Sequence, residues 1–208
     1  HNGPSTCSQK VRLILGLKNL TYESKIIDLQ AGEQHDAEYI KLNPNHVVPT
    51  LICDEKILVE SSLILEFLED KFPEKSARSN IPEEIHQMRL WMKTIDAYHI
   101  HGGSITYGIG VRNILILKPK DELDKEIDEI PDLEKRENRR DLIENGLEAK
   151  CVIEGLKQSK ILMDKLELGL RDREWFSGSK FGLADASIFP YVLRGEQLTL
   201  NDYCESSS

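Results

Sequence analysis

The sequence lacks several features that would place a protein in a class at first sight. Its apolar runs all fall short of the ~20 residues that a helix needs to span a bilayer, and no secretory signal is visible at its start. Positive charge is in the minority, with 27 Lys and Arg against 36 Asp and Glu and a formal net charge of −9. A nucleic-acid backbone and an anionic membrane surface both select a basic face. We therefore expect neither a nucleic-acid partner nor a membrane partner.

Cysteine is scarce, and its spacing indicates neither a disulfide framework nor a zinc site. No Cys-x-x-Cys pair occurs, and the two closest histidines, His99 and His101, would point to different sides of a helix. We expect no metal. Scattered thiols of this kind fit a reducing compartment, so the expected location is cytoplasmic. The cysteines are Cys7, Cys53, Cys151 and Cys204.

The N-terminal part of the chain alternates between helical and extended patterns. Some segments have apolar residues at helical spacing, whereas β-branched runs bounded by turn residues indicate strands. Asp54 and Glu55 are expected to form the turn of a hairpin. We also expect a strand before His1, since the first helix otherwise lacks the strand that should precede it. In order, the pattern predicts a helix over 8–20, a strand over 21–29, a short helix over 35–45, strands over 47–53 and 56–60, and a helix over 61–74.

The chain after Pro82 has helical patterning throughout. Pro82 is placed to start a helix, and Gly102–Gly103 is expected to loosen or break it. The segment 118–141 is dense in charge of both signs, which is typical of a solvated excursion or an exposed pair of helices punctuated by prolines. This change in composition divides the chain into a small α/β domain over 1–75 and an all-α domain over 82–208.

The stretch VVPT contains a candidate cis peptide bond between Val48 and Pro49. A bond to proline adopts the cis form at small cost, and a bend there leaves the N–H and C=O of Val48 free to pair with an extended peptide. The alternative interpretation, a proline on an ordinary edge strand, remains open.

The stretch VESS lies where a predicted strand passes into a helix. The unpaired N–H groups of the first turn and the Ser61 hydroxyl would hold a carboxylate, and the Glu60 carboxylate beside them would hold an ammonium group. Together they match the zwitterionic head of an amino acid, although an ordinary N-cap uses the same residues.

The chain opens with hydroxyls and a thiol at the mouth of its first helix. Ser and Thr are good capping residues, and a helix N-terminus also stabilises a thiolate or an alkoxide, so residues 5–8 leave two interpretations open. Near the other end of the chain, Asp185 follows Gly182 at the spacing of a capping box, which we interpret as a folding feature.

Four stretches, in this order and spacing, resemble the glutathione transferase superfamily: STCSQKVRL, LNPNHVVPTL, LVESSLILEFLEDKFP and FGLADASIFPYVL. The resemblance covers nearly the whole chain. It implies an α/β plus all-α fold, in which a thioredoxin-like N-terminal domain precedes a C-terminal helical bundle domain. It also implies a cytosolic homodimer, glutathione as the co-substrate and a role in detoxification.

The resemblance implies a role for two of the polar stretches. Val48, next to Pro49, would pair with the cysteinyl backbone of glutathione, and Glu60 and Ser61 would hold its γ-glutamyl end. Both roles agree with the peptide contact and the amino-acid site inferred from the residues themselves.

At the helix mouth the resemblance points to three different side chains. The zeta class matches Ser5 as the group that stabilises the glutathione thiolate, a reductive dehalogenase relative matches Cys7, and bacterial β-etherase relatives match Ser8. We rank them in this order because later helical residues turn away from the mouth. The helix from Pro82 onward is expected to line the electrophile pocket with Trp91, His99 and Tyr107.

The predicted activity is transfer of glutathione to a small hydrophobic electrophile, with the glutathione thiol activated as a thiolate. One alternative is a thiol route through Cys7, as in a reductive dehalogenase or a thiol oxidoreductase. Another is a binding protein without turnover that uses 118–141 for interaction. One departure from the family is Gly182, where relatives usually have Ser or Thr. Since Gly caps a helix nearly as well, we expect a small effect on stability.

Overall fold

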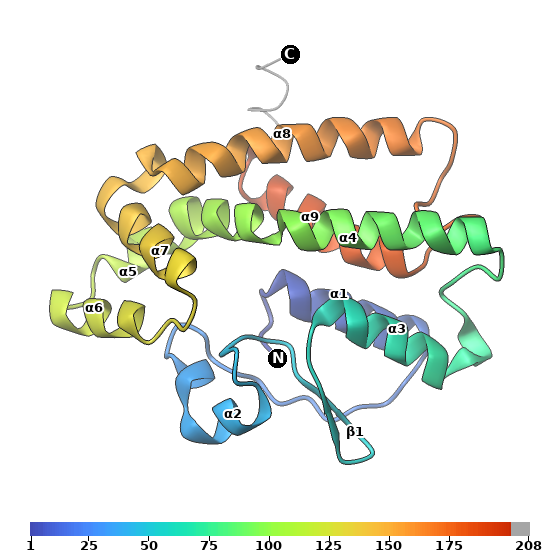
Figure 1. Ribbon diagram of the computed structural model, residues 1–208, viewed down its shortest axis with the longest axis horizontal. Helices are drawn as coiled ribbons and strands as arrows, with labels where there is room; N and C mark the ends of the chain where they lie inside the picture. Colours follow the sequence, from blue (N-terminus) through green and yellow to red (C-terminus); the bar gives the residue numbers. More distant parts are fainter. Residues whose placement is uncertain (201–208) are drawn as a thin grey trace. The chain divides into compact units, whose positions relative to one another are not determined.

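The computed structural model describes residues 1–200 (Figure 1). Within this part the chain forms helices and one two-stranded sheet, arranged as two compact units. One unit contains His1–Asp96 and Gly169–Val192, and the other contains Ala97–Leu168 and the residues from Leu193 onward.

The domain limits 1–75 and 82–208 stay a prediction. The sheet lies in the first of these ranges, and the described residues of the second are helical apart from turns, connections and an isolated bridge. Cys204, one of the four cysteines, lies outside the described residues.

In the first unit, helices α1 (Thr6–Leu17) and α3 (Ser61–Lys71) pack against each other. Apolar residues recur three and four positions apart in both helices, so each buries one face. Helix α3 stops before Pro73, which lacks the N–H that a continuing helix needs. The buried apolar residues are Val11, Ile14 and Leu15 of α1 and Ile64, Leu65 and Leu68 of α3.

The predicted hairpin is confirmed, with shorter strands than expected. Strands β1 (Leu51–Cys53) and β2 (Lys56–Leu58) pair antiparallel. Asp54 and Glu55 connect them at φ 48° and 64°, and positive φ at both central residues is the requirement of a type I′ turn. The short helix α2 (Ala37–Leu42) is also confirmed.

The strand predicted over 21–29 is wrong. This segment is irregular, although the Ile27 N–H donates to His1 C=O at 2.8 Å and the His1 amino group donates to Lys25 C=O at 2.9 Å. A ladder needs several residues in register on a neighbouring strand. Among the described residues, His1 and Asn2 are the ones whose hydrogen bonds reach this segment from the chain start, so a regular strand does not form.

Helix α4 (Pro82–Ile105) starts at Pro82 as predicted. Of the two outcomes expected at Gly102–Gly103, loosening or a break, the break does not occur. The α-helix continues for two more residues and then widens into the π-helix η3 (Thr106–Val111), which α5 (Arg112–Leu115) follows.

Tertiary packing in the second unit explains why the two glycines stay helical. Helix α8 (Lys150–Leu170) approaches α4 so closely that a Cβ at Gly155 would lie 2.9 Å from His101 C=O. The hydroxyls of Tyr98 and Ser159 lie 2.6 Å apart in the same interface. Each glycine costs a helix ~1 kcal/mol, and this packing offsets the cost.

The charged segment is a pair of helices, one of its two predicted forms. Helices α6 (Lys120–Asp128) and α7 (Leu133–Asn145) begin just after prolines. Leu123 and Ile127 of α6 are buried against Leu115, so the segment also contributes to a core. Three short 3₁₀ turns complete the elements outside α9: Glu33–His35, Pro73–Lys75 and Gly146–Glu148.

Helix α9 (Leu183–Gln197) receives its cap from a residue outside the usual position. The Asp185 carboxylate accepts the N–H of Gly182 at 3.0 Å, as the capping pattern predicts. The Ser177 hydroxyl accepts the N–H of Ala184 at 2.9 Å, which is the bond that an N-cap side chain normally makes.

Gly182 is required at this position, and the expected small effect of having glycine there is wrong. A Cβ on residue 182 would lie 2.2 Å from Ala77 C=O and 2.7 Å from the Ser177 Cβ. Ala77 C=O also accepts the N–H of Leu183 at 3.0 Å. The space of the usual capping side chain is therefore filled by Ser177 and by another segment of main chain.

From residue 1 to residue 200, no helix is both long and apolar enough to cross a membrane. The same residues place no group of three or more His, Cys, Asp or Glu side chains where a metal ion would be held.

Candidate functional site

Ser5 caps helix α1 and still has a proton to donate. Its Oγ accepts the N–H of Ser8 at 3.2 Å, and its own N–H donates to Asn2 Oδ1 at 3.3 Å. A hydroxyl has one donor and two acceptor sites, so this capping bond leaves the O–H of Ser5 available. The unpaired N–H groups of the first turn add partial positive charge at the same place. The two interpretations of this stretch, cap and anion site, are therefore compatible.

The two other candidates at the helix mouth differ in access. Cys7 is partly exposed, and its Sγ lies 3.7 Å from Tyr191 Oη. Ser8 is completely buried, and its Oγ accepts the N–H of Asn2 at 3.3 Å. Access from solvent thus favours Ser5 and Cys7 over Ser8.

Val48 combines a buried side chain with an unpaired backbone. The Val48–Pro49 peptide bond is cis, one of the two forms left open by the sequence. The Val48 side chain packs against Ile27 and Tyr39, and the neighbouring carbonyl of Val47 accepts from Tyr39 Oη at 2.7 Å. Within residues 1–200, neither the N–H nor the C=O of Val48 has a hydrogen-bond partner. Buried backbone groups are normally paired, so this residue can accept an extended peptide.

The start of α3 places the N–H groups of a helix N-terminus next to the exposed Glu60 carboxylate. Glu60 has φ 67°, a region that non-glycine residues rarely adopt. Backbone strain of this kind persists where the surrounding structure enforces it, often at ligand sites. Ser61 follows at the first turn, where N–H groups lack intrahelical partners. In the described part of the chain the exposed Glu60 carboxylate pairs with no Lys or Arg, so it is free to bind a cation.

Asp96 links the beginnings of the two helices. Its Oδ1 accepts from Ser62 Oγ of α3 at 2.6 Å and from Lys10 Nζ of α1 at 3.0 Å. Figure 1 shows α1 and α3 running alongside each other. The α1 mouth and the Glu60–Ser61 site therefore lie in one neighbourhood of the first unit.

The three residues predicted to line an electrophile pocket have different surroundings. Trp91 packs edge to face on Phe176, with ring centres 4.7 Å apart. His99 is exposed. The Tyr107 ring lies 3.4 Å from the Arg139 guanidinium carbon. Trp91 belongs to the first unit and the other two predicted residues to the second, and the pocket assignment stays a prediction.

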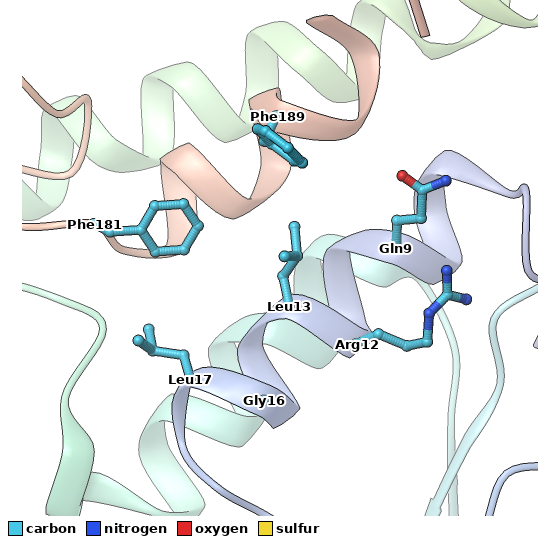
Figure 2. Close-up of a pocket in the computed structure, with 7 residues that line it drawn as sticks. All are labelled: Gln9, Arg12, Leu13, Gly16, Leu17, Phe181 and Phe189. Carbon is cyan, nitrogen blue, oxygen red and sulfur yellow. The ribbon is translucent and has the colours of Figure 1, made fainter. Parts of the chain in front are cut away.

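A groove of about 600 Å³ lies on a different face of α1 (Figure 2). The side chains of Leu13 and Leu17 point toward Phe181 and Phe189 across this groove. None of the predicted site residues lines it. Its lining residues are Gln9, Arg12, Leu13, Gly16, Leu17, Phe181 and Phe189.

Sequence reasoning missed Tyr191 and Lys10 as neighbours of the helix mouth. Tyr191 lies in a stretch that we interpreted as folding only. Lys10 lies in a helix whose one other charged residue, Arg12, donates to the main chain of Asn2 and Gly3. No local pattern marks either residue, because their contact with the site depends on how α9 and α4 pack against α1.

The chain is similar to known proteins along most of its length. Residues 4–71 match the family model described as the glutathione S-transferase N-terminal domain. Protein LigF of Sphingobium sp. (strain NBRC 103272 / SYK-6) is 29% identical over 190 residues, which are 90% of this chain and 74% of LigF. A zeta class glutathione S-transferase of Euphorbia esula is 41% identical over 86 residues, which are 41% of this chain and 37% of that protein.

Solved structures show the same fold. The crystal structure of the beta-etherase LigF from Sphingobium sp. strain SYK-6 has a TM-score of 0.84 at 29% identity and covers 92% of this chain and 80% of its own. A glutathione transferase from Pseudomonas putida, solved with one glutathione disulfide bound per subunit, has a TM-score of 0.73 at 20% identity and covers 100% and 79%. The predicted fold class, a thioredoxin-like domain followed by a helical domain, is confirmed.

Proposed function

Because this chain belongs to the glutathione S-transferase superfamily, we propose that it binds glutathione at Val48, Glu60 and Ser61 and activates the thiol at Ser5. Its relatives are glutathione transferases, and the chain is accordingly a glutathione-dependent transferase. The residue roles, the thiolate mechanism and the electrophile form our proposal. A homodimer and a cytoplasmic location belong to the same proposal.

The observation that carries the binding mode is the backbone of Val48. Val48 as a whole is only 8% exposed, yet its N–H and C=O are unpaired within the described residues. An extended peptide that adds alongside would satisfy both groups, as in strand addition. The cysteinyl residue of glutathione, with an amide on each side, is such a peptide.

The γ-glutamyl end of glutathione matches the chemistry at the start of α3. Its carboxylate would accept from the Ser61 N–H and hydroxyl, where the helix dipole favours negative charge. Its ammonium group would pair with Glu60, which has no cationic partner among residues 1–200. Both ends of the zwitterion are thereby neutralised.

Activation of the thiol follows from charge at the α1 mouth. A free thiol has a pKa near ~8.5, and each unit of lowering corresponds to ~1.4 kcal/mol in favour of the thiolate. The Ser5 O–H would donate to the sulfur while the first-turn N–H groups stabilise its negative charge. The thiolate then forms a bond to an electrophilic carbon and displaces its leaving group.

The proposed electrophile is a small hydrophobic molecule with an activated carbon, such as a halogenated ring or a benzylic ether. The similarity to a protein named as a beta-etherase favours the ether. Trp91, His99 and Tyr107 stay the proposed pocket residues.

A second candidate function uses Cys7 as the reactive group. The Cys7 thiol is partly exposed at the same helix mouth and lies beside a tyrosine hydroxyl. Glutathione would first displace the leaving group of the electrophile. The Cys7 thiolate would then attack the sulfur of this conjugate, forming a mixed disulfide with glutathione while the carbon leaves and takes up a proton, so that the carbon is reduced as the two sulfurs are oxidised. Binding without turnover is the third candidate.

Single substitutions and one substrate distinguish these functions. Calorimetry on the intact protein with millimolar reduced glutathione is expected to detect binding, and a chlorodinitrobenzene assay measures transfer. Ser5→Ala should reduce the rate at neutral pH ~10-fold by raising the thiol pKa by about one unit, and Cys7→Ala should have little effect. The opposite result assigns the reaction to Cys7. Binding without turnover in the unmodified protein supports the third candidate.

Loss of the Ser5 cap also affects folding, so a matched control is needed. Asp132 caps α7 by accepting the N–H of Lys135 at 3.0 Å, the same kind of bond that Ser5 makes. Asp132→Ala should cost ~1 kcal/mol of stability, as Ser5→Ala should, without changing the rate. A rate loss of equal size in both variants contradicts the proposed role of Ser5.

A further inference from the structure

The side chains of Cys7 and Tyr191 meet although they are 184 residues apart in sequence. The Sγ–Oη distance of 3.7 Å is within the range for a hydrogen bond to sulfur. Tyr191 is 4% exposed, and a buried tyrosine hydroxyl normally has a defined partner. The proposed roles above leave this contact unexplained.

The ordinary pKa values of the two groups indicate which of them donates in the Cys7–Tyr191 contact. Burial raises the pKa of Tyr191, and the neighbouring Cys7 raises it further, whereas a hydrogen bond with Thr6 lowers it. A partner that lowers a phenol pKa acts as a donor, and one that raises it acts as an acceptor. A thiol ordinarily has a lower pKa than a phenol, so when Cys7 ionises its sulfur accepts and the Tyr191 hydroxyl, 3.7 Å away, donates.

A completely buried cation lies behind the tyrosine ring. Lys10 is 0% exposed, and its Nζ lies 5.3 Å from the centre of the Tyr191 ring, a cation–π distance. Buried charges require a partner, and here Asp96 of α4 supplies it at 3.0 Å while also holding Ser62. The ring is therefore fixed from behind while its hydroxyl points at the thiol.

We propose that Tyr191 is a positioning residue that holds the Cys7 sulfur by donating a hydrogen bond to it and thereby favours the Cys7 thiolate. The charged and titratable groups at the Cys7–Tyr191 contact come from three helices: Tyr191 of α9 at the sulfur, Lys10 of α1 over the Tyr191 ring and Asp96 of α4 paired with Lys10. The same contact turns Cys7 toward Tyr191, which leaves Ser5 to meet the glutathione sulfur. The inference deepens the proposed function and rests on it only for this last consequence.

The pH dependence of Cys7 alkylation tests the inference. The folded protein, without glutathione, is treated with iodoacetamide over a range of pH, and modification of the Cys7 peptide is followed by mass spectrometry so that the other cysteines do not interfere. Tyr191→Phe removes the donor and keeps the ring over Lys10. The midpoint of the Cys7 profile should rise by about one unit, which is ~10-fold slower alkylation at neutral pH.

A matched variant separates positioning from general loosening. Tyr98 is also buried and hydroxyl-bonded, to Ser159, and Tyr98→Phe should leave the Cys7 profile unchanged. Thr6→Val, which removes the hydroxyl that hydrogen-bonds with Tyr191, provides a second test if Tyr191→Phe fails to fold, and should raise the midpoint by a smaller amount. An unchanged midpoint in folded Tyr191→Phe, or an equal shift in Tyr98→Phe, overturns the inference.

The outcome is separable from that of the proposed function. If calorimetry detects glutathione binding but the Cys7 midpoint does not move in Tyr191→Phe, the inference alone fails. If the midpoint moves but no binding of reduced glutathione is detected, the proposed function fails and the role of Tyr191 stands.

Discussion

Substitution of Glu60 by Gln tests the proposed γ-glutamyl site most directly. The two side chains have the same size, so the change removes one negative charge and leaves the helix start at Ser61 intact. If the Glu60 carboxylate holds the ammonium group of glutathione, Glu60→Gln should weaken binding while the fold and the α1 mouth stay as they are.

The exposure of Glu60 sets the expected magnitude. A hydrogen bond to a charged group contributes ~1.5–3 kcal/mol when it is shielded from water, whereas an exposed ion pair contributes about 0–1 kcal/mol. Glu60 is exposed in the structure, and the bound peptide would cover it only in part. We therefore expect a loss of about 1.4 kcal/mol, which is a ~10-fold higher Kd for reduced glutathione.

Isothermal titration calorimetry measures this change, and Glu55→Gln provides its control. Glu55 is also exposed and also has a positive φ, 64°, in the hairpin turn. The two variants carry the same net charge, so their difference reports a local contact. The loss in Glu60→Gln should shrink as salt is added, because salt screens exposed charges. Equal Kd values for Glu60→Gln, Glu55→Gln and the unmodified protein would refute the site.

Two further predictions concern stability. Gly182→Ser should lower the free energy of unfolding in urea by about 2 kcal/mol or more, because the added Cβ overlaps main chain. Ser177→Ala should lower it by ~1 kcal/mol, because the Ser177 hydroxyl that caps α9 is lost. A stabilised Gly182→Ser variant would contradict this account of α9. For Glu69, desolvation opposes ionisation, but hydrogen bonds from Lys18 and its other partners outweigh it and hold the pKa below the ordinary 4.5. A carboxylate whose pKa is lower in the folded state than in the unfolded state stabilises the protein at pH values above the unfolded-state pKa. This stabilisation is lost as the pH falls through the folded-state pKa. Glu69→Gln should therefore make the free energy of unfolding, measured by urea titration, depend less steeply on pH in the acid range.

Local patterns predict the helices and the hairpin of this protein well, but they wrongly predict one further strand. Helices α1, α3 and α9 are visible in the sequence because apolar spacing and capping residues lie within a few positions of one another. The strand expected over 21–29 depends on a partner strand, and no local pattern contains that information. The glycines of α4 mislead for a related reason, since the neighbour that keeps them helical is Gly155 of another helix.

The residues of the candidate site also differ in whether local sequence or a long-range contact identifies them. Ser5, Val48 and Glu60 are predicted from short motifs, because the role proposed for each depends on a backbone feature that neighbouring residues create. Tyr191 belongs to the surroundings of Cys7 through a contact across 184 positions. Its side chain gives no sign in the sequence of which residue it will meet.

The main-chain bond from Leu183 N–H to Ala77 C=O exists because residue 182 has no side chain. Any larger residue at that position would push the 76–78 connection outward and break the bond. The residue at position 182 is therefore informative: in a related sequence, glycine there permits this connection to contact the start of α9 directly, and serine or threonine rules this contact out. The identity of one small residue would thus report a loop conformation without a structure.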